Sequence, residues 1–534
     1  MQKDKVDYSL YLVTDSTPAI LGDRDLGEVV EAALKGGVTC VQYRDKTGDT
    51  GALVAAARRL HGITRRYGVP LLINDRVDVA LAVGCEGVHI GQDDMDISSA
   101  RRLLGPDAII GVTVSNARET EAACAAGADY LGIGTVFATP TKENTKSIIG
   151  VDGLQQILLQ IAAARSPVKT VCIGGINASN VSRVVWQSAG NDGKALDGVA
   201  VVSAIVAAPD PEASSRELLR LVRTPPAFAP PPQLQPHQLQ QPLAAADLVA
   251  GVVPDVVRAV DAAKPLSHNM TNLVVQNFAA NVALSVGASP IMANYGEEAR
   301  DLARLGGALV VNMGTVTPEG LANYLKALRA YNDVGGPVVF DPVGAGATAV
   351  RRAAVKTILG GGYVDVLKGN QSEILSCIHS ADADTGVQQQ QRGVDSGPAE
   401  ADTRKLARAI AQLANRRRNV VVVTGKTDLV TDGRRAYAVA NGHELLGAVT
   451  GTGCCLGTAI SAAVAARPAD KLAATLAALL HYNIAAERAA ARADVRGPGT
   501  FVPAFLDELY GIRRSTVAGD LGWLERARVE EVVL

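Results

Sequence analysis

Short apolar runs alternate with longer amphipathic stretches from about Leu10 to Val202, and this alternation restricts the possible folds more than any other feature of the chain. Apolar runs separated by helical segments are typical of strands in a parallel sheet. The runs are Leu10–Val13, Cys40–Tyr43, Leu71–Ile73, Gly87–Ile90, Ile109–Thr113, Tyr130–Gly134, Thr170–Ile173 and Gly198–Val202. Eight such runs with intervening helices predict an α/β fold, a (β/α)₈ TIM barrel.

Polar residues cluster directly after these runs, where a barrel of this type carries its chemistry. Buried charges without partners are costly, so a barrel built only for packing would not need so many of them. The polar residues are Gln42, Arg44, Lys46, Asn74, Asp75, Asp93, Asp94, Thr113, Thr139 to Lys142, Gly174, Gly175 and Ser203. We therefore expect a binding site at the carboxyl ends of the strands.

Two carboxylates, Asp75 and Asp94, follow adjacent strands. Such a pair suits a Mg²⁺ ion that keeps several waters and binds substrate phosphates. Arg44, Lys46 and Lys142 add positive charge of the kind that holds a diphosphate. The pattern predicts a diphosphate bound through a metal.

A glycine turn at Gly174-Gly175, with the backbone beside Ser203, predicts a second and separate site for a monophosphate. Single residues of this region also have ordinary explanations. Asp93 is interpretable as a helix N-cap, and His89 as a core histidine whose ring is hydrogen-bonded. Taken together, the residues favour a barrel that holds a diphosphate and a monophosphate.

The segments that carry these residues resemble thiamine phosphate synthase, in order and at the spacing of that family, from about Tyr8 to Pro209. They are Tyr11–Asp15, Gln42–Lys46, Ile73–Arg76, Gly87–Asp94 and Thr139–Lys142. The family joins 4-amino-5-hydroxymethyl-2-methylpyrimidine diphosphate to 4-methyl-5-(2-hydroxyethyl)thiazole phosphate and releases diphosphate. The resemblance implies the same reaction here. No protein nucleophile is required, because the pyrimidine methylene leaves as a stabilised cation that the thiazole nitrogen captures.

The resemblance also implies a role for each matching residue. The pyrimidine diphosphate is expected on Gln42, Arg44, Lys46, Asn74, Thr113 and Lys142, with Mg²⁺ on Asp75 and Asp94. The thiazole phosphate is expected on Thr139, Pro140, Thr141, Gly175, Val202 and Ser203. Thr113 stands where the family often has serine, which preserves the hydroxyl.

The composition changes between Thr224 and Pro242, where proline and glutamine dominate. Such a stretch cannot build a core and is typical of an extended, exposed linker. We therefore expect a barrel domain at 1–223, a linker at 224–244 and a second domain at 245–534. A polar stretch from Asp382 to Ala401 is interpreted as a tolerated surface insertion within the second domain.

The second domain combines longer helices with apolar runs that are followed by polar residues, which predicts an open α/β sheet with substrates at the strand ends. The runs are Leu309–Val311, Val338–Phe340, Val364–Leu367 and Val420–Val423. Val449 to Cys454 then leads into an apolar helical stretch, Cys455 to Ala466. Glycines before a helix start leave backbone N–H groups free to bind an anion.

Five segments of this domain resemble hydroxyethylthiazole kinase, a ribokinase-like family that transfers the γ-phosphate of ATP to the thiazole alcohol. The match covers about Val253 to Val502. The segments are Pro265–Asn272, Gly287–Met292, Asp341–Thr348, Gly369–Glu373 and Val449–Cys454. The resemblance implies Cys454 as the catalytic base or the residue that orients the alcohol. It also implies Met292 and Gly451 as thiazole contacts, Arg351 and Thr424 as ATP contacts, and Asn370 and Glu373 as organisers of Mg²⁺ through water.

Two adjacent cysteines, Cys454 and Cys455, lie where the glycine-rich segment meets the predicted helix. Cys454 lies at a glycine-rich helix start, where we expect a lowered thiol pKa that suits proton acceptance. The register of Gly451-Thr452-Gly453 favours Cys454 over Cys455 as the active thiol, and Cys455 is expected to point toward packing. Lys368 stands where arginine is common in the family, and no role is assigned to it.

The composition excludes several other classes of protein. A formal charge of −2 gives no general attraction to nucleic acid or membranes. Seven cysteines show no disulfide framework or zinc spacing, which fits a reducing compartment. The charged start Met1–Lys5 is unlike a signal peptide, and no apolar run is long enough for a transmembrane helix. We expect a cytoplasmic protein with small-molecule substrates.

The two predicted reactions are consecutive, because the kinase product is a substrate of the synthase. The arrangement resembles the fused enzyme of fungi, and that resemblance implies a homo-oligomer, a trimer of kinase domains or higher. One alternative is a non-catalytic sensor or scaffold, against which Asp75, Asp94, Lys142 and Cys454 all argue. Another is a sugar kinase fused to a different phosphate-binding barrel. The His268–Asn272 segment and the cysteine at 454 argue against it.

Overall fold

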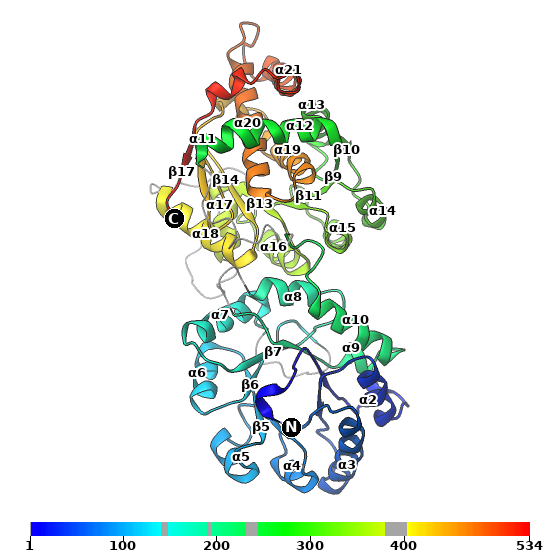
Figure 1. Cartoon of the computed structure of the whole chain (residues 1–534). Helices are drawn as coiled ribbons and strands as arrows, with labels where there is room; N and C mark the ends of the chain where they lie inside the picture. Colours follow the sequence, from blue (N-terminus) through cyan, green and yellow to red (C-terminus); the bar gives the residue numbers. More distant parts are fainter. Residues whose placement is uncertain (1, 140–147, 190–193, 231–243, 380–402) are drawn as a thin grey trace. The chain divides into compact units, whose positions relative to one another are not determined.

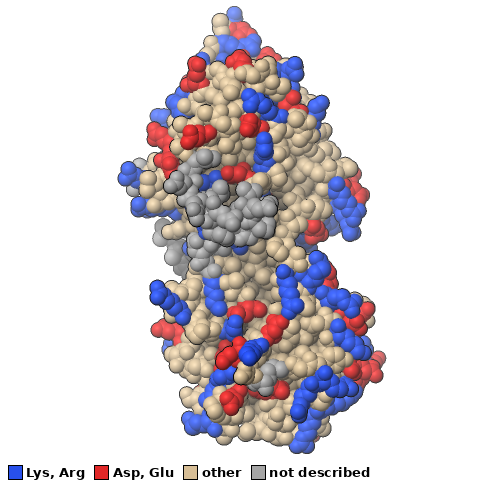
Figure 2. Space-filling view, in the orientation of Figure 1, with Lys and Arg blue, Asp and Glu red and all other residues tan. Residues whose placement is uncertain are grey.

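The structure, a computed structural model, describes residues 2–139, 148–189, 194–230, 244–379 and 403–534. The chain divides into two compact units, Met1–Pro226 and Ala227–Leu534. Basic and acidic side chains are interspersed over the visible face of each unit (Figure 2). Among the described helices, none combines the length and the apolar character needed to cross a bilayer.

The first unit is a closed barrel of parallel strands in the order β1 to β8 (Figure 1), which confirms the predicted TIM barrel. The strands are β1 Leu10–Val13, β2 Cys40–Tyr43, β3 Leu71–Asn74, β4 Gly87–Ile90, β5 Ile109–Val114, β6 Tyr130–Ile133, β7 Lys169–Ile173 and β8 Gly198–Val201. The helices are α1 Pro18–Leu21, α2 Leu26–Lys35, α3 Thr50–Arg66, α4 Val77–Val83, α5 Ile97–Leu104, α6 Ala117–Ala125, α7 Gly150–Ala163, α8 Val181–Ser188, α9 Ser203–Val206 and α10 Pro211–Arg223.

The strands of the barrel are buried on both faces, so they appear in the sequence as unbroken apolar runs. All four residues are buried in β1, β2, β6 and β8. Helix starts are fixed by side-chain caps, because Asp25, Asp49, Asp96, Asn116 and Asp210 each accept a backbone N–H of the first turn. The cap of α5 is therefore Asp96. The alternative explanation of Asp93 as that cap is wrong.

The second unit is built on a nine-stranded sheet in the order β10-β9-β11-β12-β13-β14-β15-β16-β17. The strands are parallel from β10 to β14, and β15, β16 and β17 add antiparallel pairs. They are β9 Leu266–Met270, β10 Ser289–Ile291, β11 Ala308–Asn312, β12 Val338–Asp341, β13 Val366–Asn370, β14 Val420–Thr424, β15 Asp428–Thr431, β16 Ala436–Val439 and β17 Val529–Glu531. The predicted α/β class is confirmed.

Helices cover both faces of this sheet (Figure 1). One core packs α12, α13, α19, α20 and α21 against one face, and a second core packs α14 to α18 against the other. The helices are α11 Ala245–Asp247, α12 Val253–Ala263, α13 Gln276–Val286, α14 Ala299–Arg304, α15 Pro318–Val334, α16 Ala349–Gly361, α17 Gln371–His379, α18 Thr403–Arg417, α19 Thr452–Ala466, α20 Lys471–Ala490 and α21 Pro498–Val517.

The first described residues after the barrel are not a fully exposed linker, although the sequence predicts one from Thr224. The side chain of Phe228 is only 6% exposed. Its ring stacks on Tyr363 with centroids 4.5 Å apart and an interplanar angle of 19°. The Nζ of Lys471 also donates to the carbonyl of Phe228 over 3.4 Å. The free energy gained by burying this aromatic ring is larger than the conformational entropy cost of ordering the proline-rich segment around it. Most of the predicted linker, residues 231–243, and nearly all of the predicted insertion lie outside the described residues.

We expect Phe228→Ala to lower the free energy of unfolding of the second unit by about 3 kcal/mol, because it removes a buried, stacked ring. The measurement is the midpoint of urea inactivation for each of the two activities. The matched control is Pro225→Ala, since Pro225 is exposed in the same segment. An unchanged kinase midpoint in Phe228→Ala would show that the stack does not stabilise the second unit.

Candidate active sites

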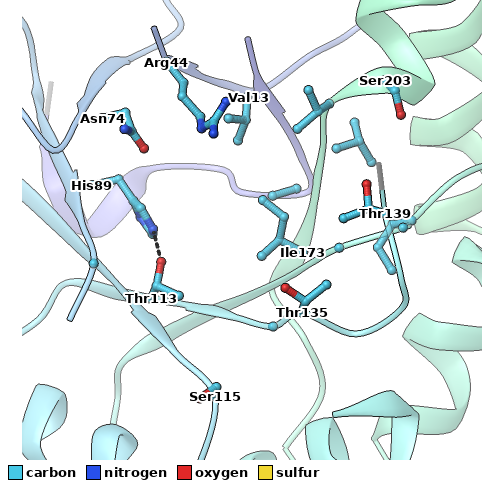
Figure 3. Close-up of a pocket in the computed structure, with 18 of the residues that line it drawn as sticks. Val13, Arg44, Asn74, His89, Thr113, Ser115, Thr135, Thr139, Ile173 and Ser203 are labelled. Carbon is cyan, nitrogen blue, oxygen red and sulfur yellow. Dashed lines mark hydrogen bonds between the residues drawn. The ribbon is translucent and has the colours of Figure 1, made fainter. Parts of the chain in front are cut away.

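A cavity of about 780 Å³ opens at the carboxyl ends of the barrel strands. Figure 3 shows side chains from several different strands around it. Most of the predicted synthase residues line this cavity: Arg44, Lys46, Asn74, Asp75, Asp94, Thr113, Thr139, Gly175, Val202 and Ser203. Pro140, Thr141 and Lys142 lie outside the described residues. The strand ends therefore bring together residues that are distant in the sequence, as the barrel topology requires.

The two predicted metal ligands lie together on one side of the cavity. The Nζ of Lys46 is 3.0 Å from Oδ2 of Asp75. Burial raises the pKa of Asp94 above its ordinary value, and the neighbouring Asp75 raises it further. Asp94 is held in place by the N–H of Gly91, which donates to its Oδ2 over 2.6 Å. Two carboxylates that oppose each other's ionisation are stabilised by a cation between them.

The donor set is compatible with Mg²⁺ but not with a closed metal cage. In the described part of the chain, no group of three or more His, Cys, Asp or Glu side chains is placed to hold a metal. Mg²⁺ commonly takes one or two protein carboxylates and completes its shell with water and substrate phosphates. Asp75 also has a φ of 62°, in the left-handed region that few residues other than glycine adopt. Such strain is often retained at functional sites.

Arg44 is oriented by a residue to which sequence reasoning assigned no role. Oδ2 of Asp15, which is buried, lies 3.2 Å from Nη1 of Arg44. The hydroxyl of Thr14 accepts the backbone N–H of Arg44 over 2.9 Å. Thr14 and Asp15 both belong to the segment Tyr11–Asp15, which carries part of the family resemblance. Only the fold shows that these two residues hold Arg44.

The glycine turn after β7 is shaped by close backbone contacts. Gly174 and Gly175 have φ values of 107° and 65°. A Cβ on Gly175 would lie 2.8 Å from the Cβ of Phe137, and one on Gly174 would lie 2.3 Å from Cγ2 of Thr135. Glycine is therefore required at both positions. Glycines carry no side chains of their own, and both line the cavity, so an anionic group can approach their backbone from it.

Two polar residues of the barrel differ from the expectation. Gln42 does not line the cavity, because it is only 4% exposed and its Nε2 donates to the hydroxyl of Tyr11 over 2.7 Å. His89 does line the cavity, and both of its ring nitrogens have hydrogen-bond partners. Its Nε2 is 2.8 Å from Oγ1 of Thr113 (Figure 3). The hydrogen-bonded ring is thus confirmed, but it belongs to the cavity wall as well as to the core.

In the second unit, α19 begins directly after Gly451, which has a φ of 91°. A Cβ at this position would lie 2.3 Å from Cγ1 of Val275, so a larger residue would clash as well as being strained. Cys454 follows in the first turn and is half-buried, whereas Cys455 lies in the apolar core. The prediction that Cys455 points toward packing is confirmed.

A chain of polar contacts connects Cys454 to the ends of β11 and β12. The Nδ2 of Asn272 lies 3.8 Å from Sγ of Cys454 and 3.1 Å from Oδ1 of Asn312. Asn312 in turn donates to Oδ2 of Asp341 over 3.0 Å. The thiol is therefore fixed relative to a buried carboxylate.

Lys368 lies at the centre of this site, although sequence reasoning assigned it no role. Its side chain is buried, and its Nζ lies 3.0 Å from Oδ2 of Asp341 and 2.7 Å from the carbonyl oxygen of Gly453. A buried charge is retained only when it is well paired. The contacts place a positive charge at the start of α19, where an anion is expected to bind.

The expected lowering of the Cys454 pKa is wrong. Burial raises the pKa of this thiol to about 11, and the negative charge of Asp341 adds to the effect. Lys368 acts in the opposite direction but does not outweigh burial. The rule for helix starts assumes solvent access, and here the loss of solvent around the thiolate has the greater effect.

The predicted metal-organising residues of the second unit are bound to backbone. Oε1 and Oε2 of Glu373 accept the N–H groups of Gly344 and Asn370, each over 2.8 Å, and Oδ1 of Asn370 accepts the N–H of Glu373 over 3.0 Å. Burial, followed by Asp341, raises the pKa of Glu373 to about 7. By contrast, Oδ1 of Asp341 is buried without a hydrogen-bond partner among the described residues. Asp341 is therefore a metal-ligand candidate that sequence reasoning missed.

Of the remaining predicted kinase residues, Arg351 lies in the first turn of α16, and Met292 and Thr424 lie at or just after strand ends. The guanidinium of Arg351 donates to the carbonyl oxygens of Met313, Val343 and Gly314 over 2.7 to 2.8 Å, so it fastens the loops after β11 and β12 together. Thr424 ends β14, and its hydroxyl donates to the carbonyl oxygen of Gly369. Met292 follows β10 and packs partly buried against the core.

Comparisons with known proteins agree with this division. The family model for thiamine monophosphate synthase matches residues 10–205, and that for the hydroxyethylthiazole kinase family matches residues 257–515. The chain is 41% identical to the probable thiamine biosynthetic bifunctional enzyme of Schizosaccharomyces pombe, with 99% of each protein covered. It is 38% identical to the thiamine biosynthetic bifunctional enzyme of Saccharomyces cerevisiae, over 95% of this chain and 96% of that protein. It is 46% identical to hydroxyethylthiazole kinase of Moorella thermoacetica, over 48% of this chain and 91% of that protein.

Proposed function

Because the chain belongs to the family of thiamine biosynthetic bifunctional enzymes, with a thiamine-phosphate synthase domain and a hydroxyethylthiazole kinase domain, we propose how its residues divide the two reactions. The site at the start of α19 phosphorylates the thiazole alcohol with ATP. The barrel cavity joins the resulting thiazole phosphate to the pyrimidine diphosphate. The observation that carries the second assignment is one cavity with a carboxylate pair beside Lys46 and a separate glycine turn.

In the barrel, the two phosphate groups are held by different elements. Arg44, oriented by Asp15, and Lys46 bind the diphosphate that leaves. Asp75 and Asp94 hold Mg²⁺, which neutralises charge on that diphosphate when it is bound. The Gly174-Gly175 turn binds the thiazole phosphate and so places the thiazole nitrogen beside the pyrimidine methylene.

In the kinase domain, charge and geometry support a phosphoryl transfer at the start of α19. Backbone N–H groups after Gly451 and the ammonium of Lys368 bind the transferring phosphoryl group. Asp341, with the carboxylate of Glu373 close enough to interact with it, would hold a Mg²⁺ ion, and the bound ion would neutralise charge on the phosphate oxygens. Cys454 orients the thiazole hydroxyl, and the small fraction of it present as thiolate accepts the proton. Arg351 supports the site by fixing its loops.

The proposal is tested by incubating the purified full-length chain with the thiazole alcohol, ATP, Mg²⁺ and the pyrimidine diphosphate. We expect thiamine phosphate, and we expect no product when ATP is omitted. Supplying thiazole phosphate directly should restore product without ATP. If thiamine phosphate fails to form under that last condition, the synthase assignment is wrong whatever the kinase domain does. Replacing Mg²⁺ by EDTA tests the metal in both steps.

We further infer that kinase domains of different chains associate, forming a trimer or a larger homo-oligomer. Leu273 and Val274 are 76% and 75% exposed, and they directly follow Asn272, which contacts the thiol of Cys454. Two adjacent and strongly exposed aliphatic side chains beside the site support an interaction surface there. We expect Leu273→Ser with Val274→Ser to lower the mass measured by light scattering. The control is Leu305→Ser, which is equally exposed elsewhere, and an unchanged mass in the double variant would contradict the inference.

The cysteines support a cytoplasmic location. All seven are free thiols, and Cys40, Cys172, Cys377 and Cys455 are buried. Such a set is typical of proteins that work in a reducing compartment.

A further inference from the structure

A continuous chain of hydrogen bonds crosses the interior of the barrel and ends in the wall of the synthase cavity. Nε2 of Gln42 donates to the hydroxyl of Tyr11 over 2.7 Å, and that hydroxyl lies 2.7 Å from the hydroxyl of Tyr130. Tyr130 is 2.7 Å from Nδ1 of His89, and Nε2 of His89 is 2.8 Å from Oγ1 of Thr113. Of these residues only His89 and Thr113 line the cavity.

The direction of the chain follows from counting donors. The amide NH₂ of Gln42 only donates, so the Tyr11 hydroxyl must use its own proton elsewhere. Its remaining partner is Tyr130, and Tyr130 in turn gives its proton to His89. Burial raises the pKa of both tyrosines well above the ordinary value, which keeps both hydroxyls protonated. The opposite direction would leave a buried hydroxyl proton without an acceptor, which is energetically unfavourable.

The direction of these hydrogen bonds determines which ring nitrogen of His89 carries the proton, and His89 lines the cavity. Because Nδ1 accepts from Tyr130, the ring proton lies on Nε2, and Nε2 donates to the Thr113 hydroxyl. Thr113 therefore does not use its own proton for His89. No second hydrogen bond of this hydroxyl is found within the described ranges, so its proton is available to an acceptor in the cavity.

We propose that Tyr130 and His89 are positioning residues for the synthase reaction: they fix the Nε2–H tautomer of His89 and thereby make the Thr113 hydroxyl a hydrogen-bond donor to the pyrimidine diphosphate. The group that it recognises is an acceptor, either a ring nitrogen or a diphosphate oxygen. This proposal rests on the proposed binding role of Thr113. It also explains why Gln42 lies outside the cavity: its amide closes the far end of the chain.

Two tyrosines of the hydrogen-bond chain give a matched pair of variants. Tyr11 and Tyr130 are both fully buried in the same interior, so Tyr11→Phe and Tyr130→Phe each remove one hydroxyl from an equivalent place. In Tyr11→Phe the Tyr130 hydroxyl still donates to His89 and the tautomer is kept. In Tyr130→Phe that donor is lost and the tautomer is no longer determined. A role in packing alone predicts equal effects of the two variants.

The direct readout is the tautomer, observed by NMR of the full-length chain labelled with ¹⁵N-histidine, with the His89 signals assigned by their absence in His89→Gln. We expect the wild type and Tyr11→Phe to show a protonated Nε2 and an unprotonated Nδ1. We expect Tyr130→Phe to show a mixture of tautomers. A proton on Nδ1 of His89 in the wild type would overturn the proposal, even if the tyrosine variants did not fold.

The second readout is kinetic and separates binding from stability. Tyr130→Phe and Thr113→Val should each raise KM for the pyrimidine diphosphate about tenfold, the size of one oriented hydrogen bond. Tyr11→Phe should stay within about twofold, since the Tyr130 hydroxyl still donates to His89. If the tautomers are as expected but Thr113→Val leaves KM unchanged, the substrate half of the proposal is wrong. If Tyr11→Phe and Tyr130→Phe raise KM equally, the positioning role is wrong.

Discussion

Replacing Asp75 should abolish thiamine phosphate formation, by about 10³-fold or more, while thiazole phosphorylation stays near its normal rate. The carboxylate contacts both Lys46 and Asp94, so its loss removes a proposed metal ligand and frees the lysine from its ion pair. The kinase residues belong to the other compact unit, which explains why their reaction should be spared. Each activity is measured separately, with thiazole phosphate supplied for the synthase.

The choice of substituent separates charge from backbone strain. Asp75 has a φ of 62°, a conformation that asparagine adopts readily and alanine does not. Asp75→Asn therefore removes the charge alone, and Asp75→Ala adds strain of about 1 to 2 kcal/mol. We expect the two variants to lose the synthase reaction equally if metal binding is the cause. The nearby control is Asp96→Asn, because asparagine caps α5 as well as aspartate does.

Two outcomes would contradict this assignment. Full synthase activity in Asp75→Asn would show that the carboxylate does not hold the metal. Loss of both activities in a folded Asp75→Asn protein would show that the two sites depend on each other. In the second case the carboxylate pair would still be a site, but not an independent one.

The barrel was predictable because its strands are buried on both faces. Runs such as Leu10–Val13 and Cys40–Tyr43 are uniformly apolar, and the observed bounds of β1 and β2 agree with them. The polar strand ends were predictable for a related reason, since the topology places all of them at one end. The local pattern was sufficient for both.

The strand β9 was missed because its interior is polar. Ser267, His268 and Asn269 are fully buried, which no local rule anticipates. Their partners are distant in the sequence: the hydroxyl of Ser267 pairs with Ser461, Asn269 accepts from Thr458, and His268 contacts the carbonyl oxygen of Ala293. Polar residues are buried at low cost only when such partners exist, and the partners become visible only in the fold.

The roles of the site residues stay predictions, and what the sequence could not give is the surroundings of each side chain. Gln42 was placed on the diphosphate by resemblance, but a strand residue can face either side, and it faces Tyr11. Lys368 was noticed without a role, because its meaning depends on Asp341 and the start of α19. The pKa of Cys454 was misjudged because burial cannot be inferred from a six-residue motif. In each case the residue type was visible and its surroundings were not.

Removing the thiol of Cys454 should lower the kinase rate strongly, by about 10²- to 10³-fold, with little change in ATP affinity. The thiol is half-buried at the start of α19 and contacts Asn272. In the proposed function it meets the thiazole hydroxyl and not the nucleotide. The measurement is kcat for Cys454→Ala together with ATP binding by calorimetry. The control is Cys455→Ala, which should keep kcat and cost only modest stability, since Cys455 packs in the core.

The raised pKa of Cys454 gives a second and sharper test. The thiol pKa is about 11. At pH values below 11, the thiolate fraction therefore rises about tenfold for each unit by which the pH is raised. If the thiolate accepts the proton, kcat of the wild type should rise with pH while the protein stays folded. Cys454→Asp should retain or exceed the wild-type rate at neutral pH and depend less on pH, because a carboxylate ionises more readily than this thiol. A flat wild-type profile would leave Cys454 an orienting group and not a base. Should Cys455→Ala abolish phosphorylation while Cys454→Ala spares it, the catalytic assignment moves by one residue.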